Sequence, residues 1–305
     1  MRRLIILPIM LWSLVSCQSS VPKFDENAAF DNLLKQCEFG PRNPGSEGHS
    51  RCKSWLIDQL QVFADTVFTQ PFTYRDLKEG REHRLTNIIA RFNPDNQTHL
   101  LLGAHWDTRP WADWDPYPER RNEAIIGAND GASGVAVLLE IARILHEHPR
   151  KAGITIVLFD GEDLGVSGVN ESYANGAQYF ARNLPIPVPR SAIVLDMIGD
   201  TELTIPIERN SYRFAPGLVK TLWQLADKLN LPAFESRLGD TIYDDHVPLW
   251  EYAGIPAVDL IDFHYPTPGE NFWHTHDDVP ENCSPASLGQ VGTLLVEYIW
   301  IKTND

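Results

Sequence analysis

The chain has 305 residues, of which 43% are hydrophobic and 10% aromatic, so it has enough apolar side chains for a sizeable buried core. Its formal net charge at pH 7 is -15. This charge repels nucleic acid and anionic membrane surfaces, and no local basic patch compensates for it, so the composition argues against both as partners of the folded chain.

The first 17 residues are typical of a secretion signal. Arg2 and Arg3 precede an apolar run over residues 4–12, which is too short to span a bilayer. The following LVSC resembles the cleavage box of bacterial lipoproteins, in which the cysteine carries the lipid. We predict a lipoprotein-type signal peptide over 1–17, a lipid anchor on Cys17 and a polar tether over 18–26. A simple cleaved signal with an incidental cysteine is the alternative.

The other cysteines, Cys37, Cys52 and Cys283, are odd in number and lack the C-x-x-C spacing of a metal site. In an oxidising envelope Cys37 and Cys52 could form a disulfide, and free buried thiols are an equal alternative. The sequence leaves both states open.

The sequence pattern in the first third of the chain predicts two helices and a hairpin. Apolar residues at helical spacing predict a helix over 27–37 that ends at Gly40-Pro41. Ser46 is a residue type that commonly starts a helix, and it precedes a helical run over 50–62. Two β-like runs, 67–74 and 85–92, flank a charged turn and favour an antiparallel hairpin.

From residue 100 onward, strands and helices alternate. The nearly continuous apolar runs are typical of parallel strands that are buried on both faces. Strands are predicted over 100–104, 154–159, 192–197 and 255–260, and helices over 132–146, 177–183, 216–230 and 287–301. No internal repeat or linker divides the chain, so we predict an α/β protein with one domain over 27–305 and a mixed sheet covered by helices.

Carboxylates or histidines follow the predicted strands. The strand over 100–104 runs into His105 and Asp107, that over 154–159 into DGED, and that over 192–195 into Asp196. One acidic strand end is usually a helix cap or a solvated loop, but several on one sheet edge repel one another unless a cation lies between them. Imidazole and carboxylate are zinc ligands, and open α/β sheets bind ligands at the carboxyl ends of strands. The pattern therefore predicts a metal site.

Six motifs carry a resemblance to a known family. In order they are LGAHWD, GANDGASG, LFDGED, VLDMIGD, YDDHVP and WHTHDD, and together they resemble the zinc aminopeptidase and glutaminyl cyclase superfamily from about Phe39 onward. The WHT-x-DD, DDH-x-P and HWDTRPW segments are more similar to the glutaminyl cyclase branch, particularly its bacterial members. The resemblance implies a three-layer α/β/α sandwich with a central mixed, mostly parallel sheet.

By the resemblance, Asp130, Asp163 and His274 are the ligands of one zinc ion. His105 and Asp196 would hold a second metal, with Asp130 bridging, as in two-metal aminopeptidases. Asp107 would then fix the tautomer of His105. Because every ligand position is filled by a competent residue, one zinc and two zincs both remain open.

The resemblance also implies a reaction, in which zinc polarises the side-chain amide of an amino-terminal glutamine. Glu162 would take a proton from the α-amine and pass it to the departing ammonia, which leaves pyroglutamate. Asp244 would hydrogen-bond the leaving amide, and Asp196 would complete the acidic network. The expected partner is therefore the amino-terminal glutamine of peptides or proteins.

Trp273 and His246 are expected in the substrate pocket, although a core tryptophan and a structural histidine are the alternatives. Trp106 and Trp111 could line its mouth. The chain lacks the tryptophan that animal cyclases carry after the acidic pair and has Asp259 where they carry a histidine, although bacterial members are similar at Asp259.

Three functions compete at this point. The leading hypothesis is a zinc-dependent glutaminyl-peptide cyclotransferase in the bacterial cell envelope, facing the periplasm and held at the membrane only by its lipid anchor. The second is a two-zinc aminopeptidase that uses Glu162 as general base. The third is a non-catalytic binding lipoprotein on the same scaffold, which the intact acidic and histidine positions disfavour.

Overall fold

Six strands form the central sheet in the computed structural model, which describes residues 21–96 and 99–302. The order across the sheet is β1-β2-β4-β3-β5-β8. Strands β4, β3, β5 and β8 are parallel, whereas β1–β2 and β2–β4 are antiparallel. The bounds are β1 Thr66–Arg75, β2 Glu82–Phe92, β3 His99–His105, β4 Gly153–Phe159, β5 Ser191–Asp196 and β8 Ala257–Ile261. The predicted mixed, mostly parallel sheet and its antiparallel hairpin are confirmed.

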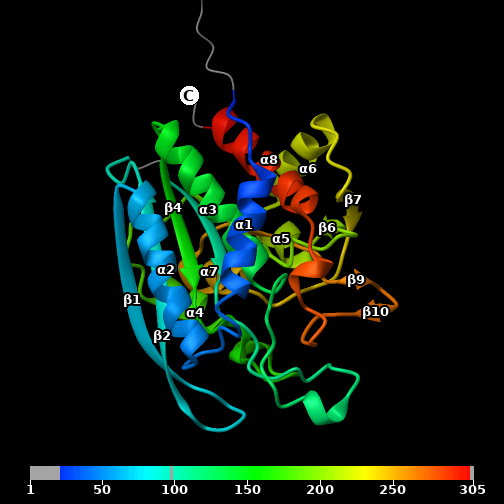
Figure 1. Cartoon of the computed structure of the whole chain (residues 1–305). Helices are drawn as coiled ribbons and strands as arrows, with labels where there is room; N and C mark the ends of the chain where they lie inside the picture. The colour runs from blue at the N-terminus through cyan, green and yellow to red at the C-terminus, as the bar shows by residue number, and fades with distance from the viewer. Residues whose placement is uncertain (1–20, 97–98, 303–305) are drawn as a thin grey trace, which may run out of the picture.

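The sheet lies between two layers of helices. Figure 1 shows α1, α2 and α3 side by side across the face nearer the viewer. The bounds of the longer helices are α1 Glu26–Cys37, α2 Glu47–Phe63, α3 Ala132–Glu147, α4 Asn175–Arg182, α6 Pro216–Lys228 and α8 Pro285–Lys302. Each corresponds to a predicted helix, and Ser46 caps α2 by accepting a hydrogen bond from the His49 N–H at 3.0 Å.

Alternating residues of each central strand enter two different hydrophobic cores. In β3, Leu100 and Leu102 pack with α1, α2, α3, α6 and α8, whereas Leu101 packs with α4 and with α7, His246–Ala253. This follows from the two-residue period of a strand, which sends successive side chains to opposite faces. The nearly continuous apolar runs are therefore explained by burial on both faces, and the α/β/α sandwich is confirmed.

Several short elements have no counterpart in the sequence prediction. Helix α5 has only six residues, too few for helical periodicity to stand out, and α7 contains Pro248, which is unfavourable within a helix. These elements are α5 Arg209–Phe214, α7 His246–Ala253, β6 Ile205–Ile207, β7 Phe234–Leu238, β9 Pro266–Thr267 and β10 Glu270–Asn271, with single 3-10 turns at Pro118–Arg120, Glu162–Leu164, Asn170–Ser172 and Pro280–Asn282.

The end of the expected tether belongs to the folded domain. Phe24 is 5% exposed and lies in the main core against Gly292 of α8, and Asp25 caps α1 through the N–H groups of Asn27 and Ala28. The signal peptide, Cys17 and the first residues of the tether lie outside the described residues. Within residues 21–96 and 99–302, Cys37, Cys52 and Cys283 are free, and no helix has the length and hydrophobicity needed to cross a membrane.

Candidate active site and metal centre

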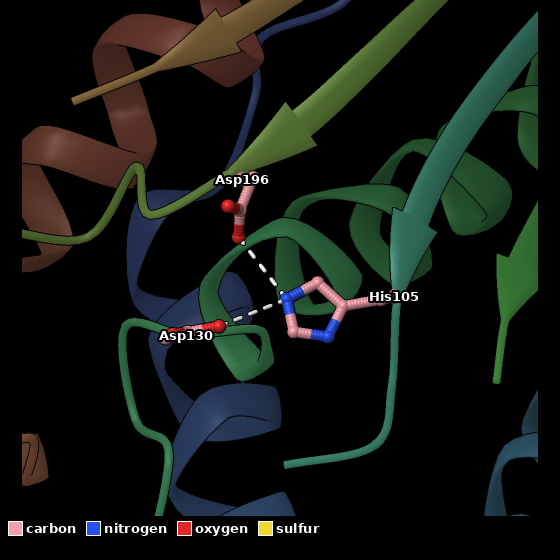
Figure 2. A group of neighbouring side chains, drawn as sticks. All are labelled: His105, Asp130 and Asp196. Carbon is pink, nitrogen blue, oxygen red and sulfur yellow. Dashed lines mark hydrogen bonds and ion pairs between the residues drawn. The ribbon is translucent and has the colours of Figure 1, made fainter. Parts of the chain in front are cut away.

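Three acidic or histidine side chains meet where β3, β5 and the loop before α3 come together. His105 ends β3, Asp196 ends β5, and Asp130 lies two residues before α3. Figure 2 shows both carboxylates directed at the same imidazole nitrogen, with the Nε2 of His105 3.0 Å from Asp130 and 3.1 Å from Asp196. Parallel strands end at one edge of the sheet, which is why residues 91 positions apart come into contact.

Asp130 also belongs to a second group with Asp163 and His274. The Nε2 of His274 lies 2.9 Å from Asp163 and 3.7 Å from Asp130, and all three side chains are buried. One potential ligand atom from each lies within 4.8 Å of the others, and the second carboxylate oxygen of Asp163 has no hydrogen-bond partner. Two carboxylates and an imidazole are a donor set that suits zinc, so these residues fit the metal implied by the sequence.

The glycine after Asp130 has a steric role. A Cβ atom on Gly131 would collide with the imidazole ring of His105, so only glycine lets the loop approach this side chain. The backbone N–H groups of Asn129 and Asp130 donate to the carboxylate of Asp278 at 2.7 and 3.2 Å. The ANDG segment therefore lies against His105 at Gly131 and is bound by Asp278 at Asn129 and Asp130. These contacts place Asp130 where it belongs both to the group of His105 and Asp196 and to the group of Asp163 and His274.

Glu162 and Asp163 lie on a single 3-10 turn after β4, Glu162–Leu164. Both backbone N–H groups donate to the carboxylate of Asp107, at 3.1 and 3.2 Å. Asp107 itself lies 3.7 Å from the Nδ1 of His105, beyond hydrogen-bond distance. Asp107 therefore holds the acidic turn through two backbone hydrogen bonds and also lies beside the imidazole of His105, whose tautomer it would fix in a two-metal site.

The acidic side chains of the site have different protonation preferences. Burial, followed by the charge of Asp163, raises the pKa of Glu162 well above its usual range. Burial also opposes the ionisation of Asp163, but the neighbouring His274 outweighs it and lowers the pKa of that carboxyl. Burial raises the pKa of Asp244 to about 6. Glu162 is thus suited to hold a proton and Asp163 to hold a cation.

A cavity of about 500 Å³ opens over these residues. Its wall includes Glu162, Asp196, Asp244, Tyr173, Phe263 and Trp273, together with the ligand group of Asp130, Asp163 and His274. The indole of Trp273 is stacked on the imidazole of His274 with 3.8 Å between ring centroids. The cavity therefore combines acidic groups at its base with an aromatic wall.

The structure corrects the expectation for His246, which is fully buried and does not line the cavity. Its Nε2 lies 3.1 Å from Glu208, and its Nδ1 lies 3.5 Å from Asp259 of β8. Trp106 and Trp111 also lie outside the cavity wall, and Trp106 is stacked on His49. None of these three residues lines the cavity.

Two residues of the HWDTRPWAD segment were assigned no role from the sequence, and the structure places them next to the metal-ligand group. Arg109 is buried and contacts the backbone of the acidic turn, and Asp113 lies 3.4 Å from the Nδ1 of His274. Their spacing of four residues, with opposite charges, is the signal that could have paired them. By contrast, Asp160 of the DGED motif binds His49 and the Thr86 N–H and lies outside the ligand groups.

Comparisons with known proteins agree with this geometry. The model of peptidase family M28 matches residues 87–299. This chain belongs to peptidase family M28. It is 25% identical to the glutaminyl-peptide cyclotransferase of Bos taurus in an alignment 299 positions long, which covers 85% of this chain and 77% of that protein.

Solved structures of family M28 resemble the chain over almost its whole length. The glutaminyl cyclase of Bacteroides thetaiotaomicron is 34% identical, covers 94% of this chain and 100% of its own, and superposes with a TM-score of 0.89. A zinc-dependent exopeptidase of Parabacteroides distasonis is 33% identical, with the same coverage and TM-score. The resemblance to bacterial glutaminyl cyclases and the zinc-dependent enzyme class of this M28 protein are therefore confirmed.

Proposed function

We propose that this M28 protein is a glutaminyl-peptide cyclotransferase, which converts the amino-terminal glutamine of a peptide or protein to pyroglutamate and releases ammonia. The observation that carries the proposal is the likeness to glutaminyl cyclases over almost the whole chain. The cavity supports it, because the buried carboxyl of Glu162 lies beside the group of residues that fits a metal ion.

One zinc ion per chain, held by Asp130, Asp163 and His274, is the metal content that we propose. When bound, zinc supplies a Lewis acid that polarises the side-chain amide carbonyl of the substrate. The indole of Trp273 forms an apolar wall beside this position, where it can contact the methylene groups of the glutamine side chain.

Glu162 carries the proton in the proposed reaction. A bond forms between the α-amino nitrogen and the side-chain carbonyl carbon, and the bond from that carbon to the amide nitrogen breaks. The Glu162 carboxylate takes a proton from the amine and passes it to the amide nitrogen, which leaves as ammonia. Asp244 accepts a hydrogen bond from the leaving amide, and Asp196 completes the acidic network on the same wall.

A two-zinc aminopeptidase is the second candidate, and one observation favours it. His105, Asp130 and Asp196 form a further buried group of ligand atoms (Figure 2), so Asp130 could bridge two metal ions. In that function Glu162 would act as general base for a water nucleophile.

An assay on protein of measured metal content separates the two candidates. We expect ammonia release from glutaminyl peptides, no cleavage of amino-acid arylamides, and one zinc per chain. Arylamide cleavage with two tightly bound zincs and no ammonia release would replace the cyclase with the aminopeptidase. Full biological activity of a Glu162→Gln protein would favour the non-catalytic binding lipoprotein instead.

We infer from the first 17 residues that the protein is exported and held in the bacterial cell envelope, facing the periplasm, by a lipid on Cys17. Fractionation of cells that carry Cys17→Ala tests this inference. The variant is expected in the soluble envelope fraction and the unaltered protein in the membrane fraction. Equal membrane association of both proteins would contradict the anchor.

A further inference from the structure

The buried guanidinium of Arg109 reaches two separate parts of the metal centre. Its Nη1 donates hydrogen bonds to the backbone carbonyls of Asp163, at 2.8 Å, and Gly165, at 2.7 Å. Its Nε and Nη2 donate to the two carboxylate oxygens of Asp113, at 3.2 and 2.7 Å. Arg109 is 1% exposed, so these contacts replace the water that the charge would otherwise bind.

Asp113 extends this contact to the second part of the centre. One of its oxygens lies 3.4 Å from the Nδ1 of His274, while the Nε2 of the same ring lies 2.9 Å from Asp163. The carboxylate of Asp113 thus lies beside Nδ1, on the side of the ring away from Asp163, and orients the imidazole so that Nε2 faces Asp163 and Asp130.

Asp163 and His274 are 111 positions apart in the chain. The side chain of Arg109 contacts the turn that carries Asp163 directly and reaches His274 through Asp113. We propose that Arg109 and Asp113 are positioning residues for the metal centre: Arg109 fixes the turn of Asp163 through its carbonyls and fixes His274 through Asp113. This inference rests on the proposed ligand role of Asp163 and His274. The planar fork of arginine is required, because a lysine ammonium cannot present parallel donors to a carboxylate and reach two carbonyls as well.

The test compares zinc affinity in Arg109→Lys and Asp113→Asn proteins, measured by competition with a chelator. We expect the Kd for zinc to rise about 10- to 100-fold in each variant, as for partners that orient metal-bound histidines. Saturating zinc should restore part of the enzymatic activity that each variant loses. Asp113→Asn is expected to lower the melting temperature of the metal-free protein, because it leaves the buried charge of Arg109 without its carboxylate partner, so the Kd for zinc is compared at a temperature where each variant is folded.

Arg143 and Glu140 provide a matched control within α3. They form the same kind of two-pronged pair, with bonds of 2.8 and 2.6 Å, and neither residue lines the cavity. Arg143→Lys and Glu140→Gln are expected to lower the melting temperature without changing the Kd for zinc. A Kd in Asp113→Asn equal to that of the unaltered protein would overturn the proposal, even if Arg109→Lys failed to fold.

The outcome is independent of which reaction the enzyme performs, since zinc affinity is measured without substrate. If Asp163→Asn and His274→Asn left zinc affinity unaltered, the proposed metal centre would be wrong. If those two variants lost zinc and Asp113→Asn did not, only the positioning role would be wrong.

Discussion

Burial and the charge of Asp163 raise the pKa of Glu162 well above its usual range, whereas the neighbouring His274 lowers the pKa of the adjacent Asp163. In the proposed reaction these two consecutive residues of one 3-10 turn have different roles, Glu162 as proton carrier and Asp163 as metal ligand. Hydrogen bonds from the backbone of this turn to Asp107, and from Arg109 to its backbone, fix the turn and therefore the different directions of the two carboxyl side chains.

Replacing Glu162 with glutamine keeps the volume of the side chain but removes its ability to carry a proton. We expect kcat/KM for glutaminyl peptides to fall about 10²- to 10⁴-fold, with zinc content unchanged. The exposed Glu171 provides a control, because Glu171→Gln should keep its activity. A Glu162→Gln protein within a few-fold of the unaltered enzyme would show that another group moves the proton.

Glu208 is a buried carboxylate outside the cavity whose ionised form stabilises the fold. Burial opposes its ionisation, but His246 and the N–H groups of Ile242 and Ser211 outweigh it and lower its pKa from 4.5 to about 2. Because the folded-state pKa is the lower one, the stabilisation is complete above the unfolded pKa and is lost as the pH falls through the folded pKa.

Glu208→Gln is therefore expected to lower the free energy of unfolding by about 3 kcal/mol at pH 7. The difference between variant and unaltered protein should shrink between pH 4.5 and about 2, as measured by denaturant unfolding at several pH values. Glu235→Gln, which removes an exposed pair with Arg237, should cost about 1 kcal/mol or less. A pH-independent difference for Glu208→Gln would argue against this account.

At the scale of elements, α1 is attached to α8 through a residue that precedes the helix. Phe24 packs against Gly292 of α8, where any larger side chain would occupy the space of its ring. The hydrophobic contact and the Asp25 cap together fix the start of α1. The folded domain therefore begins before the first predicted helix.

Phe24→Ala should lower the free energy of unfolding by about 3 to 5 kcal/mol, since it empties a filled position in the core. Denaturant unfolding of a protein that starts at residue 21 measures this loss. The neighbouring Lys23 is exposed, and Lys23→Ala should change the stability by less than about 0.5 kcal/mol. Equal effects of the two substitutions would mean that residues 21–25 act as a tether after all.

At the scale of the whole molecule, the parallel strands bring side chains of the same charge together at one edge of the sheet. Five buried carboxyl groups from four separate segments surround the cavity base: Asp130, Glu162, Asp163, Asp196 and Asp244. The net charge of -15 adds to their mutual repulsion. A bound cation relieves this repulsion in the folded state only, so metal binding and folding are coupled.

Removal of the metal by a chelator is accordingly expected to lower the melting temperature. Free zinc at a thousand times its Kd should stabilise the folded state by about 4 kcal/mol. Thermal unfolding at a series of free zinc concentrations measures the effect, and His274→Asn should abolish most of it. A zinc response of the same size in that variant would place the stabilising site elsewhere.

The main helices and strands and most of the cavity could be predicted from local patterns. Apolar runs identify the buried strands because each strand is covered on both faces, and the acidic residues at their ends converge because parallel strands end at one edge. The choice of Asp130, Asp163 and His274 as ligands and of Glu162 as proton carrier came from the resemblance to the zinc aminopeptidase and glutaminyl cyclase superfamily, and the structure brings the first three side chains together. The sequence by itself therefore determined the fold class and the chemical character of the site.

Only the tertiary structure decided which side chains support that site and from where. His246 contacts Glu208 and does not line the cavity, Phe24 lies in the core, and Asp107 binds the acidic turn. Arg109 links Asp163 to His274 through Asp113, a connection that spans loops far apart in the chain. The physical reason is that loop contacts depend on how distant segments pack together, and no periodicity of strands or helices records that packing.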